Sequence, residues 1–484
     1  MNMSYEWGEG MSHTNFTEIV KLLPEELRRT IKTISFQALD EAAKNFVHTV
    51  GLRFKSAEWL NDYFPPDFLL HGDVAHFSMD EALHDTTHFT PFVEKALIEQ
   101  GDKICIIGDV HADLGYLVTI LAELQRQGYL DKDYRLIDPS MHIAFVGDYT
   151  NRNHHSVEVM LTLFYLYRRN VDRVFLLRGN HEYAISVRVV YEIYQTLMSD
   201  HSDTKPHNGL KDAFIAEISR KLHVYRFPDL LYWFDFLPMS LYIGCYDDTH
   251  NRFNYINVCH GGIEPGYLPN EFLTSSARFE RIAQLKRYEI MQQLIADEVI
   301  PDAAPVLTHA FENLHKKGLV EFVESFIKHD HVVSLTNRHN PRHLRLGMQW
   351  NSFLTESNNA IHLASSSKHR NLLFGKELTN YFFDRASNAS HRVVSMIRGH
   401  QHLDDSDDSM GLNSPMLSLL RQQQGIVRQW NGAVYTMGDG GSATTWQAFM
   451  IVSTGKNLSD WQARHYFKRE NDVEFECKMT SFCS

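Results

Sequence analysis

Five polar clusters, each directly after an apolar run, bring together the residue types that could do chemistry in this chain. In chain order they are Asp109-Val110-His111, Asp148 with Asn151-Arg152, Asn180-His181-Glu182, His260-Gly261-Gly262, and His400. Their carboxylates, imidazoles and amide oxygen suit divalent ions such as Mn, Fe or Zn. They are too many for one tetrahedral site, and they fit two ions bridged by one carboxylate, about 3.5–4 Å apart.

A pair of such ions has a definite chemistry. It clamps a phosphoryl group, lowers the pKa of a bound water and presents hydroxide in line with the leaving group. Arg152 supplies the complement, because a guanidinium fork matches phosphate oxygens bidentately. Each cluster alone is a weak signal, since Gly-Asp is a common dipeptide and a histidine after a strand is often structural. The five clusters in order are hard to obtain by chance, and they indicate phosphoester hydrolysis.

The elements that must position these clusters are short apolar runs of strand length. The runs that precede the clusters are 104–107, 143–146, 174–177, 255–258 and 393–397. Helical patterns separate the first three runs, which is the strand-helix-strand-helix-strand signature of a parallel sheet. Because ligands bind outside the carboxyl ends of strands in open α/β sheets, the clusters are expected to meet at one edge.

Helical spacing marks the N-terminal region. Over residues 14–50, Pro24 stands where a first helical turn tolerates proline, and Leu27 and Ile31 follow on one face. We expect these helices to pack on a larger body.

Residues 270–330 form a second helical region in the prediction. Phe279, Ile282 and Leu285 lie at helical spacing, and two prolines interrupt the middle, which suggests a helical hairpin. Such an insertion could be scaffold, a lid or a hairpin that docks partners. Residues 403–413 are acidic and serine-rich, and they are expected to form a solvated loop.

The composition excludes several classes of protein. With 43% hydrophobic residues the chain is too apolar to be disordered, and a net charge of −13 argues against a general nucleic-acid binder. Five cysteines without a C-x-x-C motif argue for a reducing compartment and against a thiolate zinc site. Since the sequence shows neither a membrane-length apolar run nor a signal peptide, we expect a cytoplasmic protein, or one secreted into a host cell without a cleaved signal.

The order GDVH, GDYTNR, RGNHE, HGG and RGHQ resembles the phosphoprotein phosphatase (PPP) family of metallophosphatases. These are the serine/threonine phosphatases of the protein phosphatase 1, 2A and calcineurin type. The resemblance covers about residues 102–455. It includes Gln349-Trp350-Asn351-Ser352, which resembles the tryptophan-containing loop of the family.

The resemblance implies an α/β (α+β) fold, the calcineurin-like metallophosphoesterase four-layer β-sandwich flanked by helices. A helical N-terminal region, 1–100, is expected to pack on this core. The catalytic domain would span 101–455 and contain the helical insertion 270–330. Residues 456–484 would form a C-terminal tail.

The resemblance also implies a set of metal ligands. It assigns Asp109 and His111 to the first ion and Asp148 to the bridge. It assigns Asn180, His260 and His400 to the second ion. Two divalent cations are implied, Mn²⁺ in the first place, with Fe and Zn as alternatives.

His181 would be the general acid that protonates the leaving alkoxide or phenoxide, and Arg152 would bind the phosphate. A second phosphate-binding cation is expected just before Phe374-Gly375. There Lys368 matches the spacing of the family and Arg370 matches the residue type.

The second motif departs from the family pattern. It reads GDYTNRN where the family usually has GDxVDRG, so Asn151 replaces the carboxylate that orients the catalytic histidine. An amide can accept from the ring N–H, but it brings no charge and fixes the tautomer less firmly. We expect a less basic His181 and a site in which phosphotyrosine competes with, or exceeds, phosphoserine as substrate.

A second departure lies near the closing strands. The usual asparagine-tyrosine element is replaced by Gly438-Asp439-Gly440-Gly441, so the substrate contacts and toxin sensitivity of the family are not expected to carry over. The divergent core with its helical additions is similar to bacterial effector phosphatases of the Legionella Wip type.

The leading interpretation is a phosphatase of phosphorylated proteins that binds no nucleic acid and whose helical insertion could dock partners. One alternative is hydrolysis of a small phosphoester or a dinucleoside polyphosphate, as in related members of the same superfold. Another is a catalytically weak pseudophosphatase that docks partners.

Overall fold

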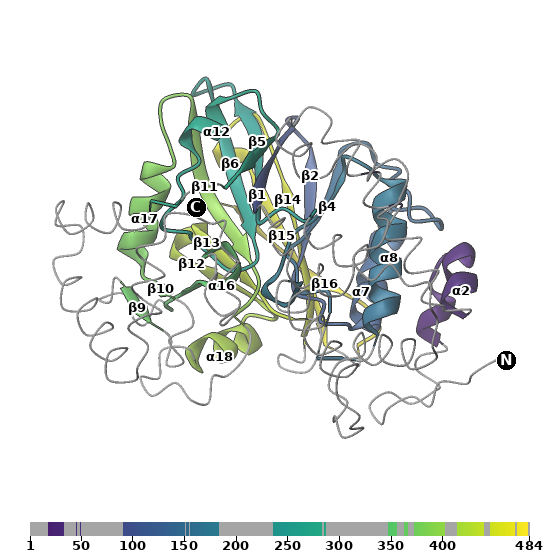
Figure 1. Ribbon diagram of the computed structural model, residues 1–484. Helices are drawn as coiled ribbons and strands as arrows, with labels where there is room; N and C mark the ends of the chain where they lie inside the picture. Colours follow the sequence, from purple (N-terminus) through teal and green to yellow (C-terminus); the bar gives the residue numbers. More distant parts are fainter. Residues whose placement is uncertain are drawn as a thin grey trace, which may run out of the picture.

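In this computed structural model, the described residues are 18–32, 45, 49, 91–150, 152–153, 155–182, 236–282, 285–286, 347–355, 363–365, 372–401, 414–439, 446–469 and 472–482. They form two large β-sheets that lie face to face, with helices on both outer sides (Figure 1). A small three-stranded sheet joins β8 (Ser352–Phe353), β10 (Leu372–Phe374) and β9 (Leu363–Ser365) beside this sandwich.

The first large sheet has six strands in the order β16-β15-β14-β2-β3-β4. Their bounds are β2 (Lys103–Ile107), β3 (Met141–Phe145), β4 (Val174–Leu176), β14 (Trp446–Ser453), β15 (Gln462–Arg469) and β16 (Glu476–Ser481). Strands β2, β3 and β4 run parallel, and helices α7 (Leu114–Arg126) and α8 (Ser156–Arg169) connect them. The predicted strand-helix-strand-helix-strand unit is therefore confirmed.

Both faces of this sheet are buried. Cys105 and Ile107 point outward and pack with α7 and α8, whereas Ile104 and Ile106 pack between the two sheets. Side chains alternate between the faces of a strand, so a strand covered on both sides must be apolar throughout. This explains why β2 reads as a continuous apolar run.

The second large sheet has seven strands in the order β12-β13-β11-β6-β5-β1-β7. Their bounds are β1 (Phe92–Ile98), β5 (Ser240–Asp247), β6 (Arg252–Cys259), β7 (Phe279–Arg281), β11 (His391–Arg398), β12 (Ile426–Gln429) and β13 (Val434–Met437). Strands β6, β11 and β13 run parallel, so their carboxyl ends lie at the same edge.

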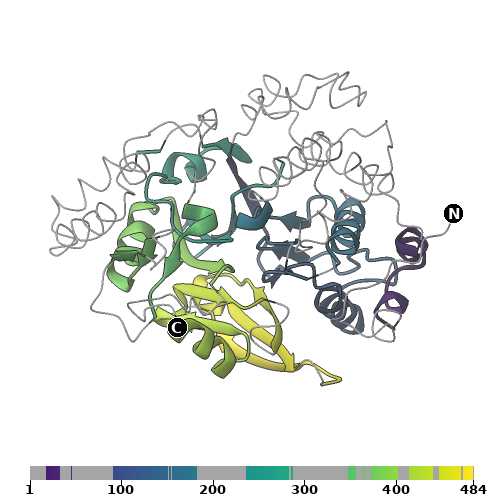
Figure 2. The ribbon, with the colours of Figure 1, turned by 60° about the horizontal axis from the view of Figure 1, so that its bottom comes forward.

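Helices cover the outer face of the second sheet as well. Phe382 of α17 (Lys376–Arg385) packs with Met396 of β11, and Phe272 of α12 (Asn270–Thr274) packs with Tyr242 of β5. The shorter elements are α16 (Gly347–Trp350), α18 (Ser414–Gln422), η4 (Trp430–Gly432) and η5 (Leu458–Asp460). The order helices, sheet, sheet, helices, seen from a second side in Figure 2, confirms the predicted fold class.

The N-terminal helix α2 (Glu25–Lys32) packs on the outer helical layer, beside α8. Leu27 and Ile31 are buried there, and the Glu26 carboxylate lies 3.1 Å from Arg168 and 2.6 Å from Arg169. Packing on the larger body is as expected for this helix. The segment 33–44 of the predicted helical region lies outside the described residues.

Two expectations, for the N-terminal region 1–100 and for the helical insertion 270–330, were wrong. Strand β1 lies within the region 1–100 that was expected to be helical, yet it pairs with β5 and β7 inside the second sheet. Phe279 and Ile282 were expected on a helix, but residues 279–281 form β7, because their backbone pairs with that of β1. Residues 287–346, which hold the rest of the predicted hairpin, lie outside the described residues.

The expected C-terminal tail is also corrected. Residues 456–484 contain β15 and β16, which extend the first sheet from β14. Trp461 and Phe482 are buried, and Phe482 stacks on Tyr435 of the second sheet. These aromatic side chains anchor the segment to the two sheets.

No described helix has both the length and the apolar character needed to cross a membrane. The predicted acidic loop, 403–413, lies outside the described residues.

Candidate metal centre

The polar clusters follow strands of both large sheets and meet between them. Asp109 follows β2 and Asp148 follows β3 in the first sheet, whereas His260 follows β6 and His400 follows β11 in the second. Nε2 of His260 lies 3.3 Å from Oδ2 of Asp148, a contact that links the two sheets. The described clusters therefore lie close together at strand ends as expected, but they come from two facing sheets rather than from one edge of a single sheet.

Left-handed backbone conformations are concentrated in these clusters. The φ angles are 46° at His111, 54° at Asp148, 69° at Arg152 and 68° at His400. Non-glycine residues adopt such angles at a cost, and they persist where surrounding contacts hold them. One such contact is visible: the Asp148 carbonyl accepts the N–H of His111 at 2.7 Å, which ties the first cluster to the second.

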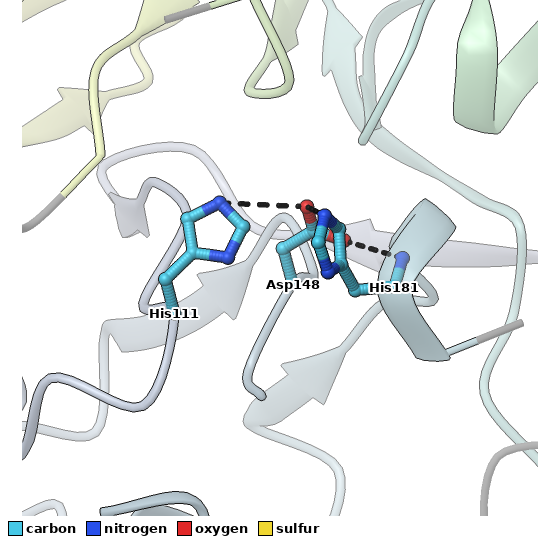
Figure 3. Close-up of side chains that lie close together, drawn as sticks. All are labelled: His111, Asp148 and His181. Atoms are coloured by element: carbon cyan, nitrogen blue, oxygen red, sulfur yellow. Dashed lines mark hydrogen bonds and ion pairs between the residues drawn. The ribbon is translucent and has the colours of Figure 1, made fainter. Parts of the chain in front are cut away.

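Asp148 is the centre of the arrangement. Its Oδ2 lies 3.3 Å from Nε2 of His260, 3.6 Å from Nε2 of His111 and 3.8 Å from Nε2 of His181. This oxygen is buried and makes no hydrogen bond within the described part of the chain. Figure 3 shows the rings of His111 and His181 beside the carboxylate, whose Oδ1 accepts the His181 backbone N–H at 2.9 Å. A buried anionic oxygen that faces three imidazoles is a suitable place for a cation.

The remaining predicted ligands are joined to this group through His260. Oδ1 of Asp109 lies 3.4 Å from Nδ1 of His260, and Oδ2 of Asp109 accepts the backbone N–H of His400 at 3.0 Å. Oδ1 of Asn180 lies 2.7 Å from Nε2 of His260 and 3.1 Å from Nδ1 of His400. All six side chains assigned as ligands from the sequence therefore lie in one cluster.

Two groups of possible ligands stand out among the described residues. One contains His111, Asp148 and His181, and the other contains Asp109, Asp148 and His260. They share Asp148, the residue to which the resemblance assigned the bridge. The first group also contains His181, which the resemblance assigned to proton transfer rather than to a metal.

The electrostatics of the cluster fit a cation. Burial alone would raise the pKa of Asp148, but the imidazoles of His260, His181 and His111 hold it well below its usual range. Burial opposes the protonation of His260, yet the carboxylates of Asp148 and Asp109 raise its pKa to about 10. Burial, with the nearby His260 and Arg398, holds the pKa of His400 well below its usual value. The anionic carboxylates and the neutral ring of His400 are the forms that bind divalent metals.

Two glutamates position the site, and their roles were not predicted. Glu182, inside the RGNHE motif, accepts the backbone N–H groups of Asp148 at 2.8 Å and Gly179 at 2.9 Å. Glu264 accepts the N–H of Gly347, at the start of the helix that carries the tryptophan, at 2.6 Å. Glu182 was visible as part of its motif, whereas the sequence carries no signal for the contact of Glu264.

The tryptophan loop lies against the centre. The Trp350 ring lies edge-on to His400 with 5.9 Å between ring centroids, and Gln349 donates to the carbonyl of Gly179 at 2.8 Å. Arg152 lies four residues after Asp148, and its side chain is 27% exposed. The predicted Asn151, Lys368 and Arg370 lie outside the described residues.

Known proteins resemble this chain in sequence. The family model described as calcineurin-like phosphoesterase matches residues 102–404. The serine/threonine-protein phosphatase PP2A-like PPG1 of Candida albicans is 27% identical over 188 residues, which are 38% of this chain and 35% of that protein. The serine/threonine-protein phosphatase 4 catalytic subunit of Kluyveromyces lactis is 26% identical over 178 residues, 37% of this chain and 44% of that protein. This chain thus spans less than half of each of these two relatives.

A solved structure shows a looser likeness. The serine/threonine phosphatase from Saccharomyces cerevisiae with similarity to human phosphatase PP5 aligns with 88% of this chain and 95% of its own, at 16% identity and a TM-score of 0.41.

Proposed function

Because the chain belongs to the calcineurin-like phosphoesterase family, we propose that it is a metal-dependent phosphoprotein phosphatase. The family makes it a metallophosphoesterase, and its relatives include serine/threonine-protein phosphatases. The observation that carries the proposal is the buried Oδ2 of Asp148, which faces three imidazoles and is shared by two ligand groups.

The residues present fit two divalent cations, Mn²⁺ in the first place. Asp109, His111 and Asp148 would hold one of them. Asp148, Asn180, His260 and His400 would hold the other. When bound, these ions supply an acidified water and Lewis-acid polarisation of the phosphoryl group.

The side chains around the ligands would bind the substrate and move a proton. Arg152 lies four residues after the buried Asp148 and has a side chain that is 27% exposed, so its guanidinium would be accessible to two phosphate oxygens at once. His181 has a side chain that is 22% exposed, so its ring can meet a leaving group from solvent while its backbone N–H binds Asp148. It would donate a proton to the leaving oxygen as that oxygen departs.

The decisive test is turnover of p-nitrophenyl phosphate and of phosphoserine and phosphotyrosine peptides by purified protein with Mn²⁺. We expect all three to be hydrolysed. Turnover of a dinucleoside polyphosphate but of neither peptide would favour the small-phosphoester alternative. Metal binding without any turnover would favour the pseudophosphatase.

Replacement of the phosphate-binding arginine should weaken substrate binding. In Arg152→Lys the charge stays but the bidentate fork is lost, so we expect KM for p-nitrophenyl phosphate to rise roughly tenfold. Steady-state kinetics with Mn²⁺ measure this change. An unchanged KM would contradict the assignment of Arg152 to the phosphate.

The residue at 151 should set the preference between substrates. In Asn151→Asp a carboxylate would support the imidazolium form of His181, and this helps alkoxide leaving groups more than phenoxides. We expect the ratio of kcat/KM for phosphoserine over phosphotyrosine peptides to rise roughly tenfold or more. Paired peptides of one sequence measure it, and an unchanged ratio would contradict the role of Asn151.

Docking through the helical insertion, the absence of nucleic-acid binding and delivery into a host cell stay predictions.

A further inference from the structure

A second buried carboxylate, that of Asp439, stands beside the phosphate-binding arginine. Its Oδ2 lies 3.8 Å from Nη1 of Arg152, and its side chain is only 4% exposed. Asp439 belongs to the segment 438–441, where this chain departs from the phosphatase pattern. The proposed mechanism gives this carboxylate no task.

The fold brings Asp439 to the site. Strands β11 and β13 run parallel with Arg398 opposite Thr436, so the chain leaves both strands at one edge, toward His400 and Asp439. A Cβ atom on Gly108 would lie 2.4 Å from the carbonyl oxygen of the residue before Asp439. The turn after β2, which leads into the metal ligands, therefore packs directly on this backbone.

The position of the Asp439 carboxylate allows it to restrain the guanidinium of Arg152. Arg152 lies in a loop, has a left-handed backbone with φ of 69°, and carries a long side chain with many rotamers. Asp439 is buried, and neither group of possible metal ligands contains it. A guanidinium has five N–H donors in a fork, so one edge can face Asp439 while others remain for phosphate oxygens.

We propose that Asp439 is a positioning residue that holds the Arg152 guanidinium in the orientation that binds the substrate phosphate. The inference rests on the proposed function and names a residue through which that site recognises phosphate. Because a restrained arginine loses less freedom on binding, Asp439 acts on phosphate affinity rather than on hydroxide attack.

The variant Asp439→Asn, which removes the charge and keeps the shape, tests this inference. We expect KM for p-nitrophenyl phosphate and the inhibition constant of inorganic phosphate each to rise roughly tenfold, as for other outer partners of site residues. The kcat should change less than about twofold, because the interaction is made in the ground state and the transition state alike. A merely structural role would lower the amount of folded enzyme and leave both constants unchanged.

A double-mutant cycle makes the test specific. In an Arg152→Ala background, Asp439→Asn should change neither constant further, because it acts only through the arginine. Asp384→Asn, an exposed aspartate on α17, is the control and should leave both constants as in the wild type. Equal effects in both backgrounds, unchanged constants, or tighter phosphate binding would overturn the inference.

Two further measurements separate failure of this inference from failure of the proposed function and from misfolding of the variant. Calorimetric titration of inorganic phosphate into the Mn²⁺-loaded protein repeats the cycle without turnover. If the wild type hydrolysed no phosphoester, the proposed function would fail, while the coupling of Asp439 to Arg152 in phosphate binding would still decide this inference. If Asp439→Asn does not fold, Asp439→Ser should produce the same roughly tenfold change.

Discussion

Asp148→Asn should abolish Mn²⁺-dependent phosphatase activity. The substitution keeps the shape of the side chain and removes the charge from the one oxygen that three imidazoles face. We expect kcat/KM to fall at least as far as on loss of an oxyanion donor, roughly 10²–10³-fold. Calorimetry should also show the loss of high-affinity Mn²⁺ binding, and Mn²⁺ should no longer raise the melting temperature. In the wild type, Mn²⁺ at 100 times its Kd should stabilise the fold by about 2.7 kcal/mol.

A matched control separates loss of the metal from loss of a buried carboxylate. Asp247, which ends β5, is equally enclosed at 1% exposure and accepts hydrogen bonds from Thr249, His250 and Asn254. Asp247→Asn should lower the melting temperature while Mn²⁺ affinity and activity per folded molecule stay as in the wild type. Full activity in Asp148→Asn would refute the bridging role of that residue.

Gly399→Ala should inactivate the enzyme by displacing a ligand. A Cβ atom at this position would lie 1.9 Å from Oδ1 of Asp109 and 2.8 Å from Cγ2 of Val146. Real Cβ atoms do not approach other atoms this closely, so the carboxylate or the loop that carries His400 must move. A shift of about 1 Å in a reacting group can cost roughly 10²-fold in rate, which is the loss in kcat/KM that we expect.

A glycine far from the centre provides the comparison. Gly101 has a φ of +90°, and a Cβ atom added there would meet nothing within 4 Å, so Gly101→Ala strains the backbone without a steric clash. It should lose about 1–2 kcal/mol of stability and keep the activity of the folded protein. If Gly399→Ala were as active as Gly101→Ala, Asp109 would not be a required ligand.

The parts of the fold that could be predicted are those whose signal is local. Strands β2, β3 and β4 are apolar on both faces, and α7 and α8 between them show helical spacing. This parallel strand-helix-strand-helix-strand unit could therefore be predicted from the sequence. Strand β1 was not, because charged side chains occupy its centre. Glu94 is buried against Arg278 at 2.9 Å, and Lys95 donates to the carbonyl of Phe272 at 2.9 Å. The residues that bind Glu94 and Lys95 lie far away in the sequence. The sequence of β1 alone therefore does not show that these charged side chains are buried.

The same distinction applies to the site. Asp109, Asp148 and His260 could be proposed from their residue types and their places after strands, because metal ligation needs few side-chain types. The contacts that hold the site together depend on tertiary proximity. Glu264 accepts the backbone N–H of Gly347, which lies far away in the sequence. No motif near either residue predicts this contact. Candidate ligands can therefore be predicted from the sequence, whereas the residues that orient them are identified only from the structure.

The positions of β1 and β14 bear on how the protein is made. Strand β1 pairs with β5, and β2 pairs with β14, so on the ribosome each first strand emerges long before its partner. Pairings of such large sequence separation form slowly, and unpaired strands can aggregate while a nascent chain waits. The proposed metal ligands follow the same order, since His400 is synthesised long after Asp109. We therefore expect a partly synthesised chain to be inactive, because the proposed site is complete only once His400 has been added.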